Sequence, residues 1–333
     1  MGQYLAQPLS WTNGLVFILS PVALLAIVLG FVTYAIYFER KVIGWVQFRH
    51  GPTRTGPLGL LQTVADVLKL LLKEDVIPKL VDKPLFILAP LIAFVPSFAV
   101  LATIPFTETL HFADLGIGLL YYIAVSGITI LGSLCGAWAG NNKYGMIGGM
   151  RAAAQMVSYE IPLILSLVGV ILMTGSINLI DIVERQKDIG FWFFIPQILG
   201  FGIFIIASIA ELCRTPFDIV EAESELVAGH MTEYSGFRYA FFMLAEYVYV
   251  FGMASITTIV FLGGWLPPFE FLSFIPGIVW FILKFIFMVF FYMWLRATFP
   301  RLRADQLMQM GWKVLLPLSL VNIFLTALLM EFL

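Results

Sequence analysis

Eight long apolar windows constrain this chain more than any other feature of its sequence. Crossing the hydrocarbon core of a bilayer as a helix takes about 20 apolar residues. Of the 333 residues, 60% are hydrophobic and only 12% are charged, about half the charge of a soluble domain. The sequence therefore predicts an all-α polytopic membrane protein, a single integral membrane domain over residues 1–333, with spans at about 15–38, 84–104, 116–138, 152–175, 191–211, 239–262, 275–298 and 312–331.

The distribution of positive charge predicts which side of the membrane each loop faces. All Lys and Arg residues except Arg185, Lys187 and Lys284 fall in or beside the connections that follow the first, third, fifth and seventh windows. Because loops rich in Lys and Arg remain on the cytoplasmic side, these connections are expected to be cytoplasmic. Eight spans then place both termini on the outer side.

The cysteine and histidine content argues against a redox centre carried by this chain. A thiolate-bound iron–sulfur cluster takes about four cysteines, and the chain has Cys135 and Cys213. His50, His111 and His230 are too dispersed for zinc or haem ligation. No nucleotide-binding glycine motif is present. We therefore expect no bound metal, flavin or iron–sulfur cluster, and no nucleic acid partner.

The first charged stretch, residues 39–75, follows directly on an apolar window. Within it, residues 58–73 have a helical period: Gln62, Asp66, Lys69 and Lys73 recur at spacings of four, three and four, which places them on one face. This pattern predicts an amphipathic helix at the cytoplasmic interface. One interpretation is a plain surface anchor. The other, favoured by the charges at Glu39, Arg40 and Arg49, is the wall of a chamber for an amphiphile with a polar head.

The second charged stretch is an acidic cytoplasmic loop at about 212–238. Six acids lie between residues 211 and 233 against two bases, Arg214 and Arg238, on the side expected to be positive. Apolar residues interrupt the acids, which favours a packed segment over a solvated one. Crowded carboxylates raise one another's pKa, a condition for holding and passing protons. The acids of this loop are Asp218, Glu221, Glu223, Glu225 and Glu233.

Ionisable residues also lie within or at the ends of the apolar windows. Glu160, Glu211, Glu246 and Lys284 occupy windows four to seven. A charge in the bilayer is costly and is by default a candidate for function. The alternative is a structural hydrogen bond or a Glu–Lys pair, and the role of Lys284 stays open.

At this point four segments resemble a known family. ERKVIGWVQFRHGPTRTGPLGLLQTVADVLKLLLKED, NNKYGMIGGMRAAAQMVSYEIPL, AELCRTPFDIVEAESELVAGHMTEYSG and WLRATFPRLRADQLMQMGWKVLLPL are similar to the H-subunit (subunit 1) family of respiratory complex I. The resemblance implies a membrane subunit of a proton-translocating NADH:quinone oxidoreductase, inactive alone, in the bacterial cell inner membrane. It also implies a quinone substrate, ubiquinone or menaquinone, and peripheral quinone-site and iron–sulfur subunits, small membrane subunits, antiporter-like subunits and membrane lipid as partners.

The resemblance also assigns residues to roles. Those at the quinone chamber would be Glu39, Arg40, Arg49, Gln62, Asp66, Lys69, Phe217 and Arg296. The acidic loop that couples quinone chemistry to proton transfer would contain Asp218, Glu221, Glu223 and Glu225. The proton path would begin with Glu160, Glu211 and Glu246. Window three carries no acid where some members have one, so the path is not extended into it.

Three alternatives remain. A related membrane subunit of a hydrogenase or of a ferredoxin-fed complex would share many of these charges. A secondary cation/proton transporter would also need buried acids, but it predicts inverted repeats, and the two halves show none. A pure scaffold does not account for so many costly charges.

Overall fold

The protein is described by a computed structural model that covers residues 11–220, 223–272 and 274–332, and these residues form helices and loops without strands. The long helices are α2 (Trp11–Val46), α4 (Lys83–Ala99), α5 (Gly118–Ala139), α6 (Lys143–Thr174), α8 (Ile198–Glu211), α10 (Gly236–Val260), α11 (Gly277–Thr298) and α13 (Leu316–Phe332). The shorter α-helices are α3 (Gln62–Leu72), α7 (Leu179–Ile189), α9 (Glu223–Leu226) and α12 (Ala304–Gln309). Single turns η1 (Pro57–Gly59), η2 (Val100–Thr103), η3 (Gly229–Met231) and η4 (Glu270–Leu272) are 3₁₀-helical, and η5 (Met310–Leu315) is a π-helix. The predicted all-α polytopic class is confirmed.

Within the described residues, seven helices are long and apolar enough to cross a membrane. The eighth expected span differs: α8 has 14 residues and begins at Ile198, whereas the apolar window began at 191. Residues before it form turns instead, in which Phe194 N–H donates to the Phe261 carbonyl at 3.0 Å. Pro196, which has no N–H, lies in these turns. Hydropathy alone does not separate such turns from helix.

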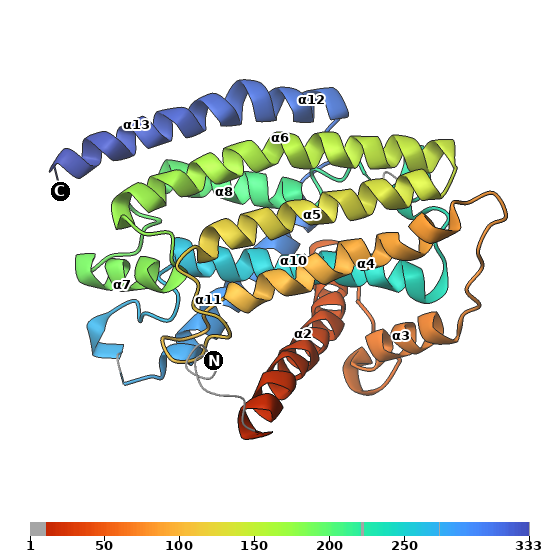
Figure 1. Ribbon diagram of the computed structural model, residues 1–333, viewed down its shortest axis with the longest axis horizontal. Coiled ribbons are helices and arrows are strands. Elements are labelled where there is room, and N and C mark those ends of the chain that lie inside the picture. Colours follow the sequence, from red (N-terminus) through yellow and green to blue (C-terminus); the bar gives the residue numbers. More distant parts are fainter. Residues whose placement is uncertain (1–10, 221–222, 273, 333) are drawn as a thin grey trace.

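The helices pack in two layers, with one steeply inclined helix at their edge. In Figure 1, α13, α6, α5 and α4 follow one another from top to bottom, α8 and α10 lie behind them, and α2 lies below α4, inclined to the others. Helix α10 forms the centre, because nearly all its residues from Tyr247 to Val260 are buried. Small residues bring neighbouring helices together: a Cβ on Gly132 of α5 would lie 2.6 Å from the Ala93 backbone of α4.

The bundle has two ends, which we name after the short helices found there. Helix α3 lies at one end and α7 at the other, at the right and left of Figure 1. Asn178 caps α7 by accepting the Ile180 N–H at 3.0 Å, and Gly190 ends it in the left-handed conformation. At the α3 end, Asn142 caps α6, and its amide donates to Glu233 at 2.7 Å. This cap starts α6 at Lys143, nine residues before the apolar window at 152.

One buried polar network joins α13 to the rest of the bundle. The Gln197 side chain donates to Thr326 at 2.7 Å and accepts from Asn322 at 3.0 Å. All three side chains are buried among apolar helices. A Cβ on Gly200 would lie 2.9 Å from both amides, so glycine leaves the space that the network needs.

Candidate functional site

The first two residues of the polar stripe, Gln62 and Asp66, turn toward α2. Asp66 accepts from Arg40 of α2 at 2.6 Å and from Gln62 at 3.1 Å, and Gln62 in turn accepts from Thr55 at 2.7 Å. These contacts place three of the expected chamber residues, Arg40, Gln62 and Asp66, together. Lys69 and Arg49 are exposed and lie outside this group; Arg49 donates to the neighbouring Gln47 at 2.7 Å.

The apolar side of α3 is uncovered in this chain. Leu68 and Leu72 are 53% and 85% exposed, while Thr63 on the opposite side is 2% exposed. The helix itself begins at Gln62, because η1 and Leu58, with φ of 56°, interrupt the expected segment from residue 58. An exposed apolar stripe on a helix of this kind suits lipid or another subunit.

Two arginines and two glutamates meet where α2, α8, α10 and α11 come together, and we call this group the arginine cluster. Glu39 pairs with Arg296, and its Oε1 lies 3.6 Å from Arg214 Nη1. Arg214 Nη2 lies 3.4 Å from Glu246 Oε2. Tyr247 completes the cluster by donating to Glu39 Oε2 at 2.8 Å, while its ring lies 4.5 Å from the Arg214 guanidinium.

The charges of the arginine cluster balance one another. Glu39 and Glu246 carry two negative charges, and Arg214 and Arg296 carry two positive charges, so the group is neutral when all four are ionised. Glu39 is 6% exposed. A charge so far from water is tolerated when it is paired and hydrogen-bonded. Because each ion touches at least one other, a proton gained by either carboxyl changes the whole group.

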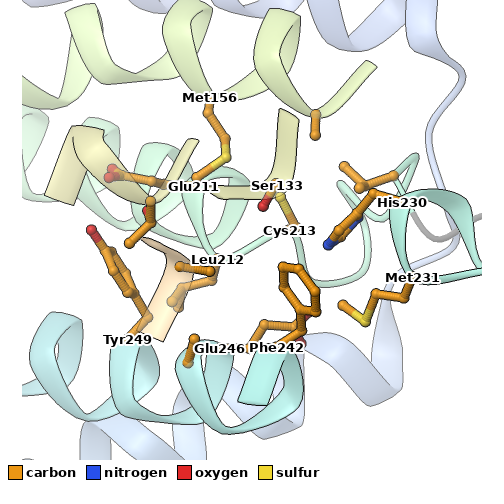
Figure 2. Close-up of a pocket in the computed structure, with 15 residues that line it drawn as sticks. Ser133, Met156, Glu211, Leu212, Cys213, His230, Met231, Phe242, Glu246 and Tyr249 are labelled. Carbon is orange, nitrogen blue, oxygen red and sulfur yellow. The ribbon is translucent and has the colours of Figure 1, made fainter. Parts of the chain in front are cut away.

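A small pocket adjoins the arginine cluster, and we call it the carboxyl pocket. Its volume is about 70 Å³, which is room for about two water molecules. Figure 2 shows Glu211 and Tyr249 at one end and His230 and Met231 at the other, with Cys213 and Ser133 between them. Glu246 lines the pocket as well as pairing with Arg214. It therefore belongs to both sites.

Two expected proton-path acids approach each other across the helices around this pocket. Glu211 at the end of α8 is 6% exposed, and its Oε2 has no hydrogen-bond partner among the described residues. Glu160 of α6 turns toward α5, where its Oε1 lies 3.2 Å from the place that a Cβ on Gly127 would take. The two carboxyl groups lie within electrostatic range of each other. Tyr159, beside Glu160, instead donates to the Leu307 carbonyl at 2.8 Å, which fixes its hydroxyl in place.

The acidic loop packs against the bundle, as its apolar residues predict. Phe217 is 3% exposed and its ring lies 5.4 Å from that of Tyr159. The Oδ1 atom of Asp218 is buried without a hydrogen-bond partner in the described part of the chain. Glu221 and the side chain of Glu223 lie outside the described residues.

Two further groups of this loop have shifted pKa values. The hydrogen bond from Arg151, 2.7 Å long, and the charge of Arg151 hold the pKa of the exposed Glu225 carboxyl below its usual range. Burial lowers the pKa of His230 to about 4, which keeps the imidazole neutral at pH 7. The neutral ring packs on Phe242, 5.4 Å away between centroids.

The sequence does not reveal how three members of these sites are placed. Arg214 was counted only as a loop base, although it joins Glu39 to Glu246. Nothing in the local sequence indicates that Tyr247 bonds to Glu39, and His230 was considered only as a possible metal ligand. One sequence signal points to Arg214: it follows Glu211, the acid that ends the fifth apolar window, by three positions. A base this close to the end of a span is a candidate partner for buried acids.

Lys284 is buried near the α7 end, away from the acids. Its Nζ donates to the carbonyls of Leu262, Gly264 and Leu266 at 2.6, 3.0 and 2.7 Å. The ammonium also lies 4.1 Å from the centroid of the Trp192 ring. Backbone dipoles and an aromatic face therefore balance its charge, and the Glu–Lys pair considered from the sequence does not form among the described residues. No group of three or more His, Cys, Asp or Glu suited to a metal ion occurs in the described part of the chain.

The chain is similar in sequence to a family of known proteins. The family described as NADH dehydrogenase matches residues 19–327. The chain is 65% identical to the H subunit of NADH-quinone oxidoreductase from Brevibacillus brevis, over 100% of this chain and 98% of the relative. It is 65% identical to the H subunit from Anoxybacillus flavithermus, over 98% of each chain, and 64% identical to that from a Geobacillus species, over 99% of each. The chain therefore belongs to the H-subunit family of NADH-quinone oxidoreductase and is a membrane-embedded subunit of that enzyme complex.

Proposed function

We propose that this subunit forms much of the quinone chamber and couples quinone reduction to proton transfer into the membrane. The chamber wall would include the α3 stripe, Gln62 and Asp66 with Arg40, and the Glu39 and Arg296 side of the arginine cluster. Phe217 would line the same region from the acidic loop. Lys69 and Arg49, which are exposed, would meet the quinone path only where a partner subunit covers them.

The observation that carries this proposal is that Glu246 belongs to both the arginine cluster and the carboxyl pocket. Its carboxylate pairs with Arg214, which pairs with Glu39, and it also lines the carboxyl pocket that contains Glu211. A change of charge at Glu39 therefore alters the field at Glu246, which alters the proton affinity of Glu211 and then of Glu160. Quinone reduction consumes protons, so it supplies such a change of charge.

The orientation follows from the positive charges. The α3 end, with most of the Lys and Arg residues, would face the cytoplasm, and both termini would lie outside. The exposed apolar stripe of α3 would meet lipid or a peripheral subunit there. Electrons would arrive from an iron–sulfur cluster on a partner subunit, and the antiporter-like subunits would receive protons from Glu160.

The alternative, a hydrogenase-type or ferredoxin-fed complex, shares the buried acids but differs in its electron source. The relatives are named NADH-quinone oxidoreductase subunits, and this favours quinone and NADH for the complex that contains this chain. The sequence and the site leave ubiquinone and menaquinone equally acceptable.

The test is a Glu246→Gln exchange in the assembled complex, reconstituted into liposomes. NADH-driven quinone reduction and proton uptake are measured together. We expect the number of protons moved per quinone reduced to fall strongly, because the glutamine amide cannot take up and release a proton as the Glu246 carboxylate can. Glu160→Gln, at the far end of the proposed path, should lower the same ratio.

The matched control is Glu184→Gln on the exposed face of α7, which removes an acid far from both sites. It should leave the ratio unchanged. If Glu246→Gln and Glu160→Gln left both quinone reduction and proton pumping intact, the proposed path would be wrong.

A further inference from the structure

A long apolar groove lies between α2 and α11, separate from the carboxyl pocket. Its volume is about 940 Å³. It runs from Leu110 and His111, in the loop at the α7 end, to Phe38 and Met293 near the α3 end. Apolar side chains from both helices form most of its walls. The groove opens on the outside of the bundle, where Ile27 and Ile286 are 64% and 53% exposed.

Two details show that the groove has room and one polar end. A Cβ placed on Gly30, which lines the groove midway along α2, meets no atom within 4 Å. At the α7 end, the Nδ1 atom of His111 is buried and has no hydrogen-bond partner among the described residues. A buried nitrogen of this kind costs free energy unless a hydrogen-bond partner is supplied by another molecule.

We propose that this groove binds an acyl chain of a membrane phospholipid, with the ester or glycerol oxygens near His111. An apolar space of this size takes up no ordered water and is not left empty in a bilayer. The apolar walls accept a hydrocarbon chain, and the His111 imidazole supplies a hydrogen bond where the chain joins the polar part of the lipid. The site does not depend on the proposed proton path.

The dimensions favour a lipid chain over a helix of another subunit. A spanning helix is about 30 Å long and about 10 Å across with its side chains, so it is wide and rigid compared with a single hydrocarbon chain. A protein helix would rest on the rim formed by residues such as Ile27 and Ile286, leaving the space beside Gly30 unfilled. A flexible chain fills it.

The site is tested with a phosphatidylglycerol that carries a diazirine in one acyl chain. The assembled complex is reconstituted into vesicles of phosphatidylethanolamine and this probe, irradiated, and digested for peptide mass spectrometry. Labelled peptides from α2 and α11 that include Gly30 or Phe285 are expected. Gly30→Leu, which places a branched side chain midway along the groove, should strongly reduce this labelling.

Gly202→Leu is the matched control, since a Cβ on Gly202 of α8 also meets no atom within 4 Å and lies outside the groove. It should leave the labelling of α2 and α11 unchanged. His111→Leu should weaken the labelling, and His111→Gln, which keeps a hydrogen-bonding group, should restore it. Quinone reduction is measured in each variant only to show that the complex is assembled.

Two results would overturn the proposal. One is labelling of the groove by a quinone with the diazirine in its isoprenoid tail, without labelling by the phosphatidylglycerol probe. The other is a cross-link from a photoreactive amino acid at Ile282 to another subunit, which would show that protein covers the groove. Equal phospholipid labelling in Gly30→Leu and the unaltered complex would also contradict it.

Discussion

Two regions of this protein bury positive charge, and they balance it in different ways. At the α3 end, Arg214 and Arg296 meet the carboxylates of Glu39 and Glu246. Toward the α7 end, Lys284 meets three backbone carbonyls and the face of Trp192. Carboxylates can gain a proton, whereas carbonyl dipoles keep the same charge at every pH. The acids of the first region can therefore take up a proton beside the arginines, whereas the partners of Lys284 do not titrate and its contacts hold the loop after α10 in place.

The largest expected effect comes from removing the central acid of the arginine cluster. Glu39→Ala leaves two arginines beside each other with Glu246 as their remaining acid. Breaking a buried pair in this way costs about 3–5 kcal/mol. We expect poor assembly of the complex and loss of quinone reduction, measured on native gels and by NADH-driven turnover. Glu39→Gln, which keeps the hydrogen bond from Tyr247 but not the charge, should assemble better. Equal assembly of both variants would mean that this hydrogen bond contributes nothing, and normal assembly of Glu39→Gln would mean that the charge is unimportant.

Removing Lys284 tests the second region, in which backbone carbonyls balance the buried charge. Lys284→Met leaves the carbonyls of Leu262, Gly264 and Leu266 without their donor, at a cost of about 2–3 kcal/mol. The midpoint of thermal unfolding in detergent should fall, while protons moved per quinone reduced should stay constant in the complexes that remain folded. A changed proton ratio in this variant would show that Lys284 belongs to the coupling machinery, and the contrast between the two regions would fail.

His230 tests whether a buried titratable group at the α3 end responds to pH. Burial keeps its imidazole neutral at pH 7. Its pKa is about 4 in the folded protein and about 6.5 in an unfolded chain. The unfolded state therefore binds more protons between these pH values, so stability is complete above pH 6.5 and falls as the pH drops toward 4. The loss at pH 5 is about 2 kcal/mol.

The measurement is the unfolding midpoint at pH 7 and at pH 5, for the unaltered protein and for His230→Gln. The variant should be less sensitive to pH over this interval. If both proteins lost the same stability between pH 7 and pH 5, another group would be responsible for the pH dependence.

The smallest expected effect is at the exposed pair of Arg151 and Glu225. Arg151 lowers the pKa of Glu225, so the pair is complete above the usual pKa of glutamate and is lost as the pH falls through the lowered value. Solvent screens such a pair, and its contribution to stability is slight. Glu225→Gln should leave the unfolding midpoint nearly unchanged at pH 7. A clear fall would show that the acidic loop is held in place by this contact.

Much of the site could be predicted because charge is rare in this chain. Glu39, Glu160, Glu211 and Glu246 stand out by their position in or beside apolar windows, and each lies where helices meet. The pairing of Glu39 with Arg214 could not be predicted, because 175 positions separate them and no local period connects them. The carboxyl pocket also depends on how α5, α6, α8 and α10 pack.

In the fold, too, features set by local sequence could be predicted, and features set by packing could not. Spacing of polar residues predicted the stripe on α3, but not that this stripe faces α2. Hydropathy predicted a helix for the apolar residues before α8. These residues form turns instead, held by the hydrogen bond from Phe194 N–H to the Phe261 carbonyl at the end of α10. Lys284 shows the limit most clearly, since its partners are backbone atoms that no side-chain pattern reveals.

The network around Gln197 has a consequence for how the chain enters the membrane. Gln197 lies at the start of α8, and its hydrogen-bond partners Asn322 and Thr326 belong to α13. During synthesis, α8 leaves the ribosome more than 100 residues before those partners do. Until α13 arrives, the amide of Gln197 has to find water or lipid headgroups. Insertion of the α8 segment is therefore complete only when the last helix of the protein has been made.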